Sequence, residues 1–423
     1  MNWKNKTSMK EIIDIGKRAK KASYELAHLS TFEKDAILNG VAKKMLASVP
    51  DLLAENKKDL EQAAEMGLKG AIVDRLMLSK ERIEGIAEGL VQIAGLEDPI
   101  GEVLEMKKRP NGLMIGKKRV PLGVVGVIYE SRPNVTADVG GLCIKTGNVC
   151  VLRGGKEAFH SNLAIVSIFR EVIEGLGHDP DMIQLVTNTT RESANALMKL
   201  NLYLDILIPR GGAGLIQAVV QNSTVPVIET GVGNCHVFVD SSADLDMAKS
   251  IVVNAKTHRP GVCNAAESLL IHKDVAEKAI PLIGKALLEA RVELRGDEQV
   301  CSMLTEAKPA TEEDWGTEYL DYIMSVKVVD SLEAAIAHIH TYGSSHSESI
   351  VTKDYDNAQY FLDRVDAAAV YVNASTRFTD GFEFGYGAEI GISTQKLHAR
   401  GPMGLKELTT TKYVIYGNGQ IRQ

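Results

Sequence analysis

Apolar residues recur at helical spacing through the N-terminal part of the chain, so this part is predicted to consist of amphipathic helices. One of these helices begins with Ser30 and Glu33 at the spacing of a capping box, which satisfies two backbone amides. Another ends at Gly67, a residue type that commonly terminates helices. Near Val103 the apolar period changes to that of a strand, and residues 101–123 predict a β-hairpin that turns at the sequence RPNG.

From Gly123 onward, short apolar strands alternate with segments of helical spacing. The predicted strands of a first series are GVVGVIYE, NVCVLRG, MIQLVTN and LDILIPRG, and a second series starts at CHVFVD. This alternation is typical of βαβ units, in which helices cover both faces of a parallel sheet. We therefore expect an α/β fold with two α/β units that abut in the sequence near Glu229–Asn234. A late strand in residues 408–423 needs a partner, either the early hairpin or another subunit.

The composition limits the partners that the chain can have. Its 423 residues suffice for two or three domains, and 45% hydrophobic with 24% charged residues is typical of a soluble globular protein. A net charge of −7 argues against a nucleic-acid or anionic-membrane partner, because both need a basic surface. No apolar run approaches a membrane span, and the N-terminus lacks the apolar core of a signal peptide. Five cysteines without a CxxC pair indicate neither a metal site nor a disulfide framework, so we expect a cytoplasmic protein without a metal ion.

Two predicted strand ends carry residues that suit a phosphate group. Gly211 and Gly212 lie between a strand and a helix, where backbone amides and the helix N-terminus can approach an anion. Arg153 and Lys156 follow another strand, where cations could hold a ribose phosphate. The glycine spacing is not G-x-G-x-x-G, however, so an ordinary tight turn with solvated loop charges explains these residues equally well.

Cys263 is a candidate nucleophile. An intracellular cysteine is most often a small core residue, but the RPG sequence just upstream forces a turn and places Cys263 at the end of a loop. Lys256, His258 and Arg259 are close in sequence, and positive neighbours favour the reactive thiolate. On these residues alone, a core residue and a nucleophile remain two open interpretations.

Glu229 lies at a predicted strand end and is followed by glycines in the sequence ETGVGN. Carboxylates at the carboxyl ends of parallel strands often face a ligand crevice. A helix-capping or interdomain hydrogen bond is an equally good interpretation of this residue.

The order of these features is more specific than any one of them. A cationic strand end, a glycine turn, the pattern E-x-G-x-G and then the cysteine follow one another as in the aldehyde dehydrogenase superfamily, which the chain resembles. The matching segments are VIYESRPNVTADV, LRGGKEA, IPRGG, ETGVGNCHVFVD, NAKTHRPGVCNAAE, NASTRFTDG and EIGISTQKLHARGPMGL. They extend over nearly the whole chain beyond the predicted N-terminal helices.

The resemblance implies a Rossmann-type cofactor domain, an α/β catalytic domain and a small β element for oligomerisation. The implied ranges are 1–103 and 121–232 for the N-terminal helices and cofactor domain, 233–378 for the catalytic domain, 379–400 for a segment that returns to the cofactor domain, and 104–120 with 401–423 for the oligomerisation hairpin and C-terminal strand. A homo-oligomer is therefore expected.

The resemblance also implies roles for cofactor-binding residues. Gly211 and Gly212 match the turn at the cofactor pyrophosphate. Arg153 or Lys156 matches the cation near the adenosine ribose, which suits a 2′-phosphate and hence NADPH, although either residue could also serve NADH. Glu318 matches the glutamate that orients the nicotinamide ribose.

Cys263 matches the superfamily nucleophile. The oxidising members have Gly-Gln just before this cysteine, where the present chain has Pro260-Gly261. Their oxyanion-hole asparagine aligns with either Ser131 or Asn134, of which Asn134 is the candidate, and the Cys263 backbone amide can contribute in both cases.

Within the superfamily, the motifs are most similar to those of reductases that act on an acyl phosphate. The implied reaction is the NADPH-dependent reduction of L-glutamate 5-phosphate to L-glutamate 5-semialdehyde in proline biosynthesis, through a thioester on Cys263 with loss of phosphate. Because no water needs activation, Glu229 is expected near the site with a lesser role than the hydrolytic base of the oxidising enzymes. The phosphate and the α-carboxylate need cations, and the candidates are His258, Arg259, Arg377 and Arg400. A functional association with glutamate 5-kinase is a further expectation.

Rival functions remain open. A cysteine hydrolase could use His258 or His272, but it would leave the glycine turns unexplained. A non-catalytic scaffold protein of the same fold would make Cys263 structural. An oxidising aldehyde dehydrogenase is the alternative within the same class of enzyme, and it would work without phosphate.

Overall fold

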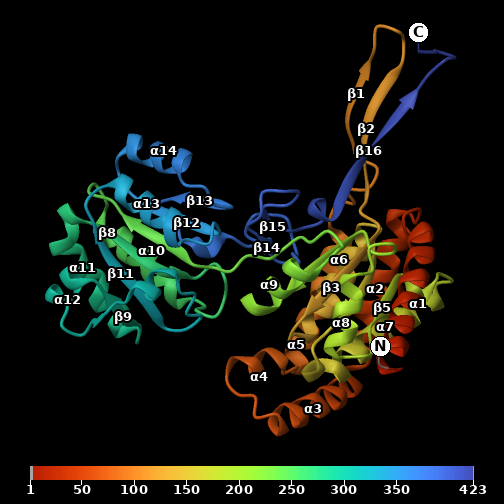
Figure 1. The fold of residues 1–423 in the computed structure, drawn as a ribbon, viewed down its shortest axis with the longest axis horizontal. Coiled ribbons are helices and arrows are strands. Elements are labelled where there is room, and N and C mark those ends of the chain that lie inside the picture. Colours follow the sequence, from red (N-terminus) through yellow and green to blue (C-terminus); the bar gives the residue numbers. More distant parts are fainter. Residues whose placement is uncertain (1–2, 423) are drawn as a thin grey trace. The chain divides into compact units, whose positions relative to one another are not determined.

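The computed structural model describes residues 3–422, which fold into two compact units (Figure 1). Unit 1 consists of Met1–Glu229, Gly385–Gly391 and Met403–Gln423, and unit 2 consists of Thr230–Phe384 and Ile392–Pro402. The chain thus first passes from one unit to the other next to Glu229, close to the predicted boundary. Among the described residues, no helix is both long enough and apolar enough to cross a membrane.

Residues 379–400 were predicted to return as one segment to the cofactor domain, but they are divided between the two units. Only Gly385–Gly391 belongs to unit 1. The flanking strands β14 (Ile392–Ser393) and β15 (Gly401–Pro402) pair with each other, and the amide of Gly231 donates to the carbonyl of Ile392 at 2.8 Å. These backbone bonds keep most of the segment in unit 2.

Unit 1 begins with the predicted helices. They are α1 (Trp3–Leu26), α2 (Thr31–Ala47), α3 (Val49–Glu65), α4 (Ala71–Leu76) and α5 (Lys80–Gly95). The capping box of Ser30 and Glu33 is present at the start of α2. Gly67 lies just beyond α3 with a φ of 71°, a left-handed conformation that glycine adopts without strain. The helix start predicted at Ser30 and the helix end predicted at Gly67 are therefore both confirmed.

A four-stranded parallel sheet forms the centre of unit 1, in the order β5-β4-β3-β6. Its strands are β3 (Val124–Tyr129), β4 (Val149–Arg153), β5 (Ile183–Leu185) and β6 (Ile206–Arg210), and its helices are α6 (Pro133–Lys145), α7 (Phe159–Gly175), α8 (Arg191–Met198) and α9 (Ala213–Asn222). The chain runs outward from β3 to β5 and then returns to β6 on the other side of β3. The chain thus leaves the neighbouring strands β3 and β6 in opposite directions across the sheet, and in open α/β sheets ligands bind at the carboxyl ends of such a pair.

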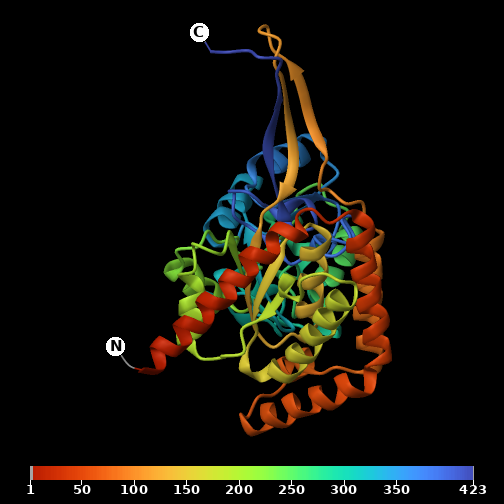
Figure 2. The same cartoon turned by 90° about the vertical axis from the view of Figure 1, so that its right-hand side faces the viewer.

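The predicted hairpin and the terminal strand form a separate antiparallel sheet of unit 1 (Figures 1 and 2). Its order is β1 (Val103–Lys108), β2 (Met114–Pro121) and β16 (Thr409–Tyr416). The partner of the terminal strand, which the sequence left open, is thus β2 of the hairpin. The outer strands β1 and β16 each keep one edge unpaired within the sheet.

Unit 2 contains a seven-stranded sheet, β10-β9-β11-β8-β7-β12-β13, in which all pairs are parallel. Its strands are β7 (Cys235–Val239), β8 (Ala266–His272), β9 (Glu293–Gly296), β10 (Lys308–Pro309), β11 (Ile323–Val329), β12 (Ser347–Val351) and β13 (Ala369–Val372). Its helices are α10 (Leu245–Thr257), α11 (Lys273–Glu289), α12 (Glu298–Met303), α13 (Leu332–Tyr342) and α14 (Tyr355–Arg364).

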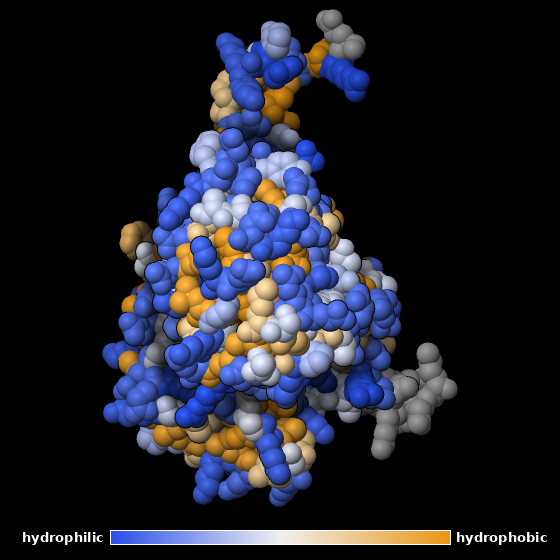
Figure 3. Space-filling model, turned by 90° about the vertical axis from the view of Figure 1, so that its left-hand side faces the viewer, coloured by the Kyte–Doolittle hydropathy of each residue, from blue (hydrophilic) through white to orange (hydrophobic). Residues whose placement is uncertain are grey.

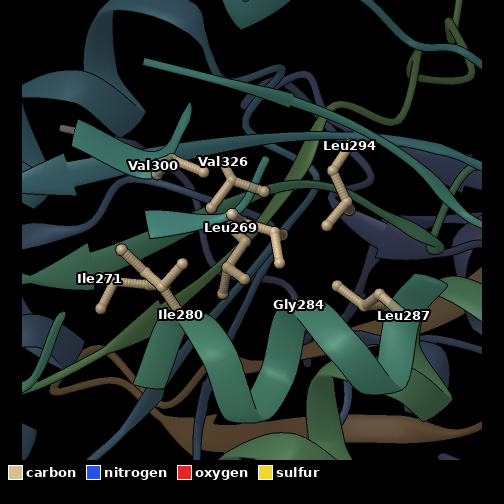
Figure 4. Close-up of a pocket in the computed structure, with 9 residues that line it drawn as sticks. Leu269, Ile271, Ile280, Gly284, Leu287, Leu294, Val300 and Val326 are labelled. Carbon is tan, nitrogen blue, oxygen red and sulfur yellow. The ribbon is translucent and has the colours of Figure 1, made fainter. Parts of the chain in front are cut away.

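Alternation along β8 sorts the core of unit 2 into two layers. Leu269 and Ile271 pack with residues of α10 and α11, whereas Leu270 packs with residues of α13 and α14 on the other face. A small gap beside α11 is lined by nine apolar residues, including Leu294 and Gly284 (Figure 4). Because this lining offers no charged side chain, the gap is a packing feature and not a substrate site.

Candidate active site

Cys263 lies in the loop between α10 and β8, at the amino end of β8. The loop turns just there, since the amide of Ala265 donates to the carbonyl of Val262 at 3.1 Å. The cysteine is half-buried. Its predicted place in a loop, outside the strand, is confirmed.

The segment before β7 contacts the Cys263 loop more closely than a side chain would permit. A Cβ atom on Gly233 would overlap the carbonyl group of Cys263. The thiol of Cys235 also donates to this carbonyl oxygen, at 3.2 Å. Cys235 is fully buried, and burial raises the pKa of its thiol well above the ordinary value, so it stays a neutral donor. Together these contacts fix the backbone from which the Cys263 side chain projects.

Asn264 joins the loop to the segment that follows β13. Its side-chain amide donates to the carbonyl of Thr379 at 2.9 Å, and its own carbonyl accepts from the hydroxyl of Thr376 at 2.7 Å. Arg377 lies between these two threonines in the sequence. Burial lowers the pKa of Arg377, the charge of Arg259 lowers it further, and Cys263 acts in the opposite direction. Arg377 is therefore within electrostatic range of both Arg259 and Cys263.

The other predicted anion-binding residues differ in their surroundings. His258 and Arg259 are exposed at the end of α10, directly before the turn. Arg400 instead donates to Asp366 at 2.8 Å, in an ion pair that includes Lys396. Arg377 thus interacts electrostatically with both Arg259 and Cys263, whereas Arg400 is bound to a carboxylate elsewhere in unit 2.

Glu318 belongs to the same network as the cysteine. It lies before β11, and its carboxylate accepts the amide of Gly233 at 2.7 Å. Gly233 thus contacts both the predicted nucleophile and the predicted ribose ligand.

Four of the predicted cofactor residues, Arg153, Lys156, Gly211 and Gly212, lie at or beyond the carboxyl ends of strands of the unit 1 sheet. Gly211 and Gly212 form the turn from β6 to α9, and Gly212 is the N-cap of α9. The amide of Gly212 donates to the carboxylate of Glu130 at 3.0 Å, and a Cβ on Gly211 would overlap this carboxylate. The Gly212 amide thus donates to an anionic oxygen at close range, and a dinucleotide pyrophosphate would take the place of the Glu130 carboxylate. These residues fit a nicotinamide dinucleotide.

Arg153 and Lys156 both follow β4, but they are engaged differently. Arg153 donates to the carbonyls of Thr189 and Thr190 at 2.6 and 3.2 Å, and its buried Nε has no hydrogen-bond partner. Burial lowers its pKa. Lys156 is exposed. Arg153 therefore holds a neighbouring loop, while Lys156 is the more accessible cation.

The two candidate oxyanion donors lie after β3. Both the amide and the hydroxyl of Ser131 donate to Glu157, at 2.8 and 2.7 Å. Asn134 is exposed in the first turn of α6 and donates to Asp138 at 3.0 Å. Both donors of Ser131 are bound to Glu157, whereas the side-chain amide of Asn134 carries a second N–H besides the one that binds Asp138, so Asn134 remains the candidate.

Glu229 is half-buried and follows a single parallel bridge between Val227 and Leu207, not a full strand. Its proposed position near the site remains a prediction.

Sequence reasoning missed several residues that contact or support the Cys263 loop. Cys235 was not among the candidates, yet its thiol donates to the Cys263 carbonyl. Lys256 was counted as a cation beside the thiol, but it is buried in an ion pair with Glu267. A carboxylate directly within an apolar strand was the one signal in the sequence for this pair.

Comparison with known proteins places this site in a family. The model of the aldehyde dehydrogenase family matches residues 4–315. The chain belongs to the aldehyde dehydrogenase family, as its motifs indicated, and it is an oxidoreductase of that family, whose members use a nicotinamide cofactor.

Several similar proteins share one name. Gamma-glutamyl phosphate reductase of Caldicellulosiruptor bescii is 60% identical over 98% of this chain and 100% of its own length. The Clostridium botulinum enzyme of that name is 61% identical over the same shares. A crystal structure of gamma-glutamyl phosphate reductase from Thermotoga maritima matches with a TM-score of 0.95 and 48% identity, covering 98% of this chain and 100% of that one. An acetylating aldehyde dehydrogenase from Geobacillus thermoglucosidasius, at 18% identity, covers all of both chains with a TM-score of 0.71 and shares the fold.

We predict that Gly233→Ala displaces the Cys263 loop, because the new Cβ would overlap the Cys263 carbonyl. The rate at which iodoacetamide alkylates the Cys263 peptide, measured by mass spectrometry, should fall markedly. Gly214→Ala is the matched control, since a Cβ at this position has nothing within 4 Å. Equal alkylation rates in the two variants would contradict the tight contact.

Proposed function

We propose that the chain reduces L-glutamate 5-phosphate to L-glutamate 5-semialdehyde with release of phosphate, using NADPH and a thioester on Cys263. The observation that carries this proposal is that Arg377 interacts electrostatically with both Arg259 and Cys263, in a chain so similar to gamma-glutamyl phosphate reductases. A thiolate and two cations suit a substrate that carries both an electrophilic carbonyl and a phosphate.

In the first step, the Cys263 thiolate attacks the acyl carbon. A carbon–sulfur bond forms and the bond from carbon to the phosphate oxygen breaks, so that inorganic phosphate leaves with the electron pair. An arginine guanidinium group can donate two parallel hydrogen bonds to a phosphate, and Arg259 and Arg377 are the candidates for this contact. The Cys263 amide and Asn134 are the candidates to stabilise the oxyanion.

When bound, NADPH would supply the hydride for the second step, the reduction of the thioester. The carbon–sulfur bond then breaks, so that the aldehyde is released and Cys263 leaves as the thiolate. Water is not a reactant in either step. Glu229 is therefore proposed to have a lesser role than a hydrolytic base.

NADPH is favoured over NADH by the charges at the carboxyl edge of the unit 1 sheet. The amides of Gly211 and Gly212 are proposed to bind the pyrophosphate, and Glu318 of unit 2 to orient the nicotinamide ribose. Lys156 is proposed to contact the 2′-phosphate, because Arg153 already donates to two carbonyls. The exposure of Lys156 supports this choice.

The sheet β1-β2-β16 supports the proposal of a homo-oligomer. Both of its outer edges are unpaired within the sheet, and such edges pair readily with another chain. The sheet also exposes large apolar side chains, which Figure 3 shows interspersed with hydrophilic ones. They are Val103, Leu104, Met106, Tyr413, Ile415 and Tyr416. A second copy of the chain would cover them, whereas association with glutamate 5-kinase and a cytoplasmic location stay predictions from the sequence.

We predict that Cys263→Ser lowers kcat by a factor of about 10³ or more, because a serine hydroxyl stays protonated and is a poor nucleophile. The assay is NADP⁺ reduction by glutamate 5-semialdehyde in phosphate buffer. Cys301→Ser is the control, since Cys301 is also half-buried but lies in α12. Full activity of Cys263→Ser would exclude the thioester route.

We predict that Lys156→Ala raises the KM for NADPH about 10-fold to 100-fold and leaves the KM for NADH unchanged, because a charge-assisted hydrogen bond to the 2′-phosphate is lost. Lys199→Ala, at another exposed lysine of unit 1, should change neither constant. An equal rise for both nucleotides would argue against the proposed contact.

We predict that Tyr413→Lys combined with Ile415→Lys lowers the molar mass measured by light scattering in solution. The two side chains are 65% and 60% exposed and lie two positions apart along β16, so they project from the same face of the sheet. Leu202→Lys is the control, because Leu202 is 79% exposed but lies outside the sheet. An unchanged mass of the double variant would remove this sheet from the subunit contact.

A further inference from the structure

A fully buried ion pair joins the two elements between which the Cys263 loop lies. Lys256 is in the last turn of α10, before the loop, and Glu267 is in β8, after it. The lysine ammonium contacts one carboxylate oxygen of Glu267, and both side chains have no exposed surface. Burial is the largest influence on both groups, raising the pKa of Glu267 and lowering that of Lys256. The two ends of the nucleophile loop are therefore joined by charges that water does not reach.

The second carboxylate oxygen of Glu267 reaches a different segment. It accepts the backbone amide of Leu320 at 3.1 Å. Leu320 has a φ of 54°, a left-handed conformation that is strained for a residue with a branched side chain. A strained backbone of this kind persists only where its surroundings hold it, and the Glu267 carboxylate supplies such a contact.

This second segment contains Glu318, two residues before Leu320. The intervening residue, Tyr319, is held as well, because its hydroxyl donates to Asp314 at 2.8 Å and the Lys256 ammonium lies 6.0 Å from its ring centroid. The ion pair thus determines the backbone on which Glu318 stands.

Glu318 completes a closed path back to the nucleophile. Its carboxylate accepts the Gly233 amide, and the Gly233 backbone packs against the Cys263 carbonyl. The path runs from Cys263 through Gly233, Glu318 and Leu320 to Glu267, and the ion pair connects its ends. Neither Lys256 nor Glu267 has exposed surface with which to touch a substrate.

We propose that Lys256 and Glu267 are positioning residues, whose ion pair sets both the loop of Cys263 and the backbone of Glu318 and so aligns the nucleophile with the ligand of the nicotinamide ribose. This inference rests on the proposed function, because that function gives Cys263 and Glu318 their roles. A sequence pattern could not reveal it, since the pair acts through Leu320, which is distant in sequence.

The test is Glu267→Gln in the full-length enzyme, with three measurements. The glutamine keeps an acceptor for the Leu320 amide but leaves the Lys256 ammonium buried without its countercharge. In cofactor-free enzyme, alkylation of the Cys263 peptide should slow. The Kd of NADPH, from the quenching of protein fluorescence, should rise several-fold. Turnover should fall about 100-fold, the cost of misplaced reacting groups, while the KM for the acyl phosphate is unchanged.

The matched control is Asp246→Asn, which removes an ion pair with Lys249 on the surface of the same helix. All variants are compared below their unfolding temperatures, measured by circular dichroism. If Glu267→Gln does not fold, Glu267→Asp serves instead, because it keeps the charge but is too short to reach both Lys256 and Leu320. It is expected to slow alkylation and weaken NADPH binding in the same way.

A lower unfolding temperature with unchanged alkylation and unchanged NADPH affinity would overturn the inference and leave the pair a purely structural one. This result is distinct from failure of the proposed function, which an active Cys263→Ser enzyme would reveal. Slower alkylation and weaker NADPH binding together, with the control unaffected, would support the positioning role.

Discussion

The contact between Gly233 and the carbonyl of Cys263 is the constraint on which the site in unit 2 depends. Two chain segments approach one another so closely at the amino ends of β7 and β8 that only a residue without a Cβ fits. Because the peptide group is planar, fixing this carbonyl also fixes the direction of the Asn264 amide and the Cα that carries the thiol. The Cys235 thiol holds the same carbonyl from a buried position. The reactive side chain can thus be placed accurately although it lies in a loop.

The two units use opposite edges of their parallel sheets. In unit 1 the glycine turn lies at the carboxyl ends of the strands, where a helix N-terminus favours an anion. In unit 2 the cysteine lies at the amino ends, directly after the C-terminus of α10, which carries the negative end of the helix dipole. The backbone there does not attract a phosphate, so side chains must supply the positive charge. In the proposed function, Arg259 and Arg377 supply this charge.

Local patterns predicted most of the fold. The period of the apolar residues identified the strands of the unit 1 sheet and the start of the second series, but not the short strands β9 and β10. Ser30, Glu33 and Gly67 marked helix ends because caps depend on neighbours in sequence. The partner of the terminal strand could not be chosen, since an unpaired strand fits any edge. The return segment was placed too broadly, because the pairing of β14 with β15 involves strands of only two residues each.

The sequence predicted individual residues of the candidate site but not the contacts between them. Cys263 and Gly211 were singled out by short motifs and Glu318 by the family resemblance, but their hydrogen-bond partners could not be predicted. Lys256 shows the reason most clearly: next to the thiol in sequence, it was read as an activating cation, whereas folding buries it against Glu267. Burial and pairing decide what a charge does, and neither is visible in one sequence.

The most direct test of the account is a burst experiment in phosphate-free buffer. Enzyme mixed rapidly with glutamate 5-semialdehyde and NADP⁺ should produce about one NADPH per active chain and then stop, because the thioester on Cys263 has no phosphate to accept the acyl group. Addition of phosphate should start steady turnover. Continuous NADPH formation without phosphate would contradict the account, because it would mean that water releases the acyl group as in an oxidising aldehyde dehydrogenase.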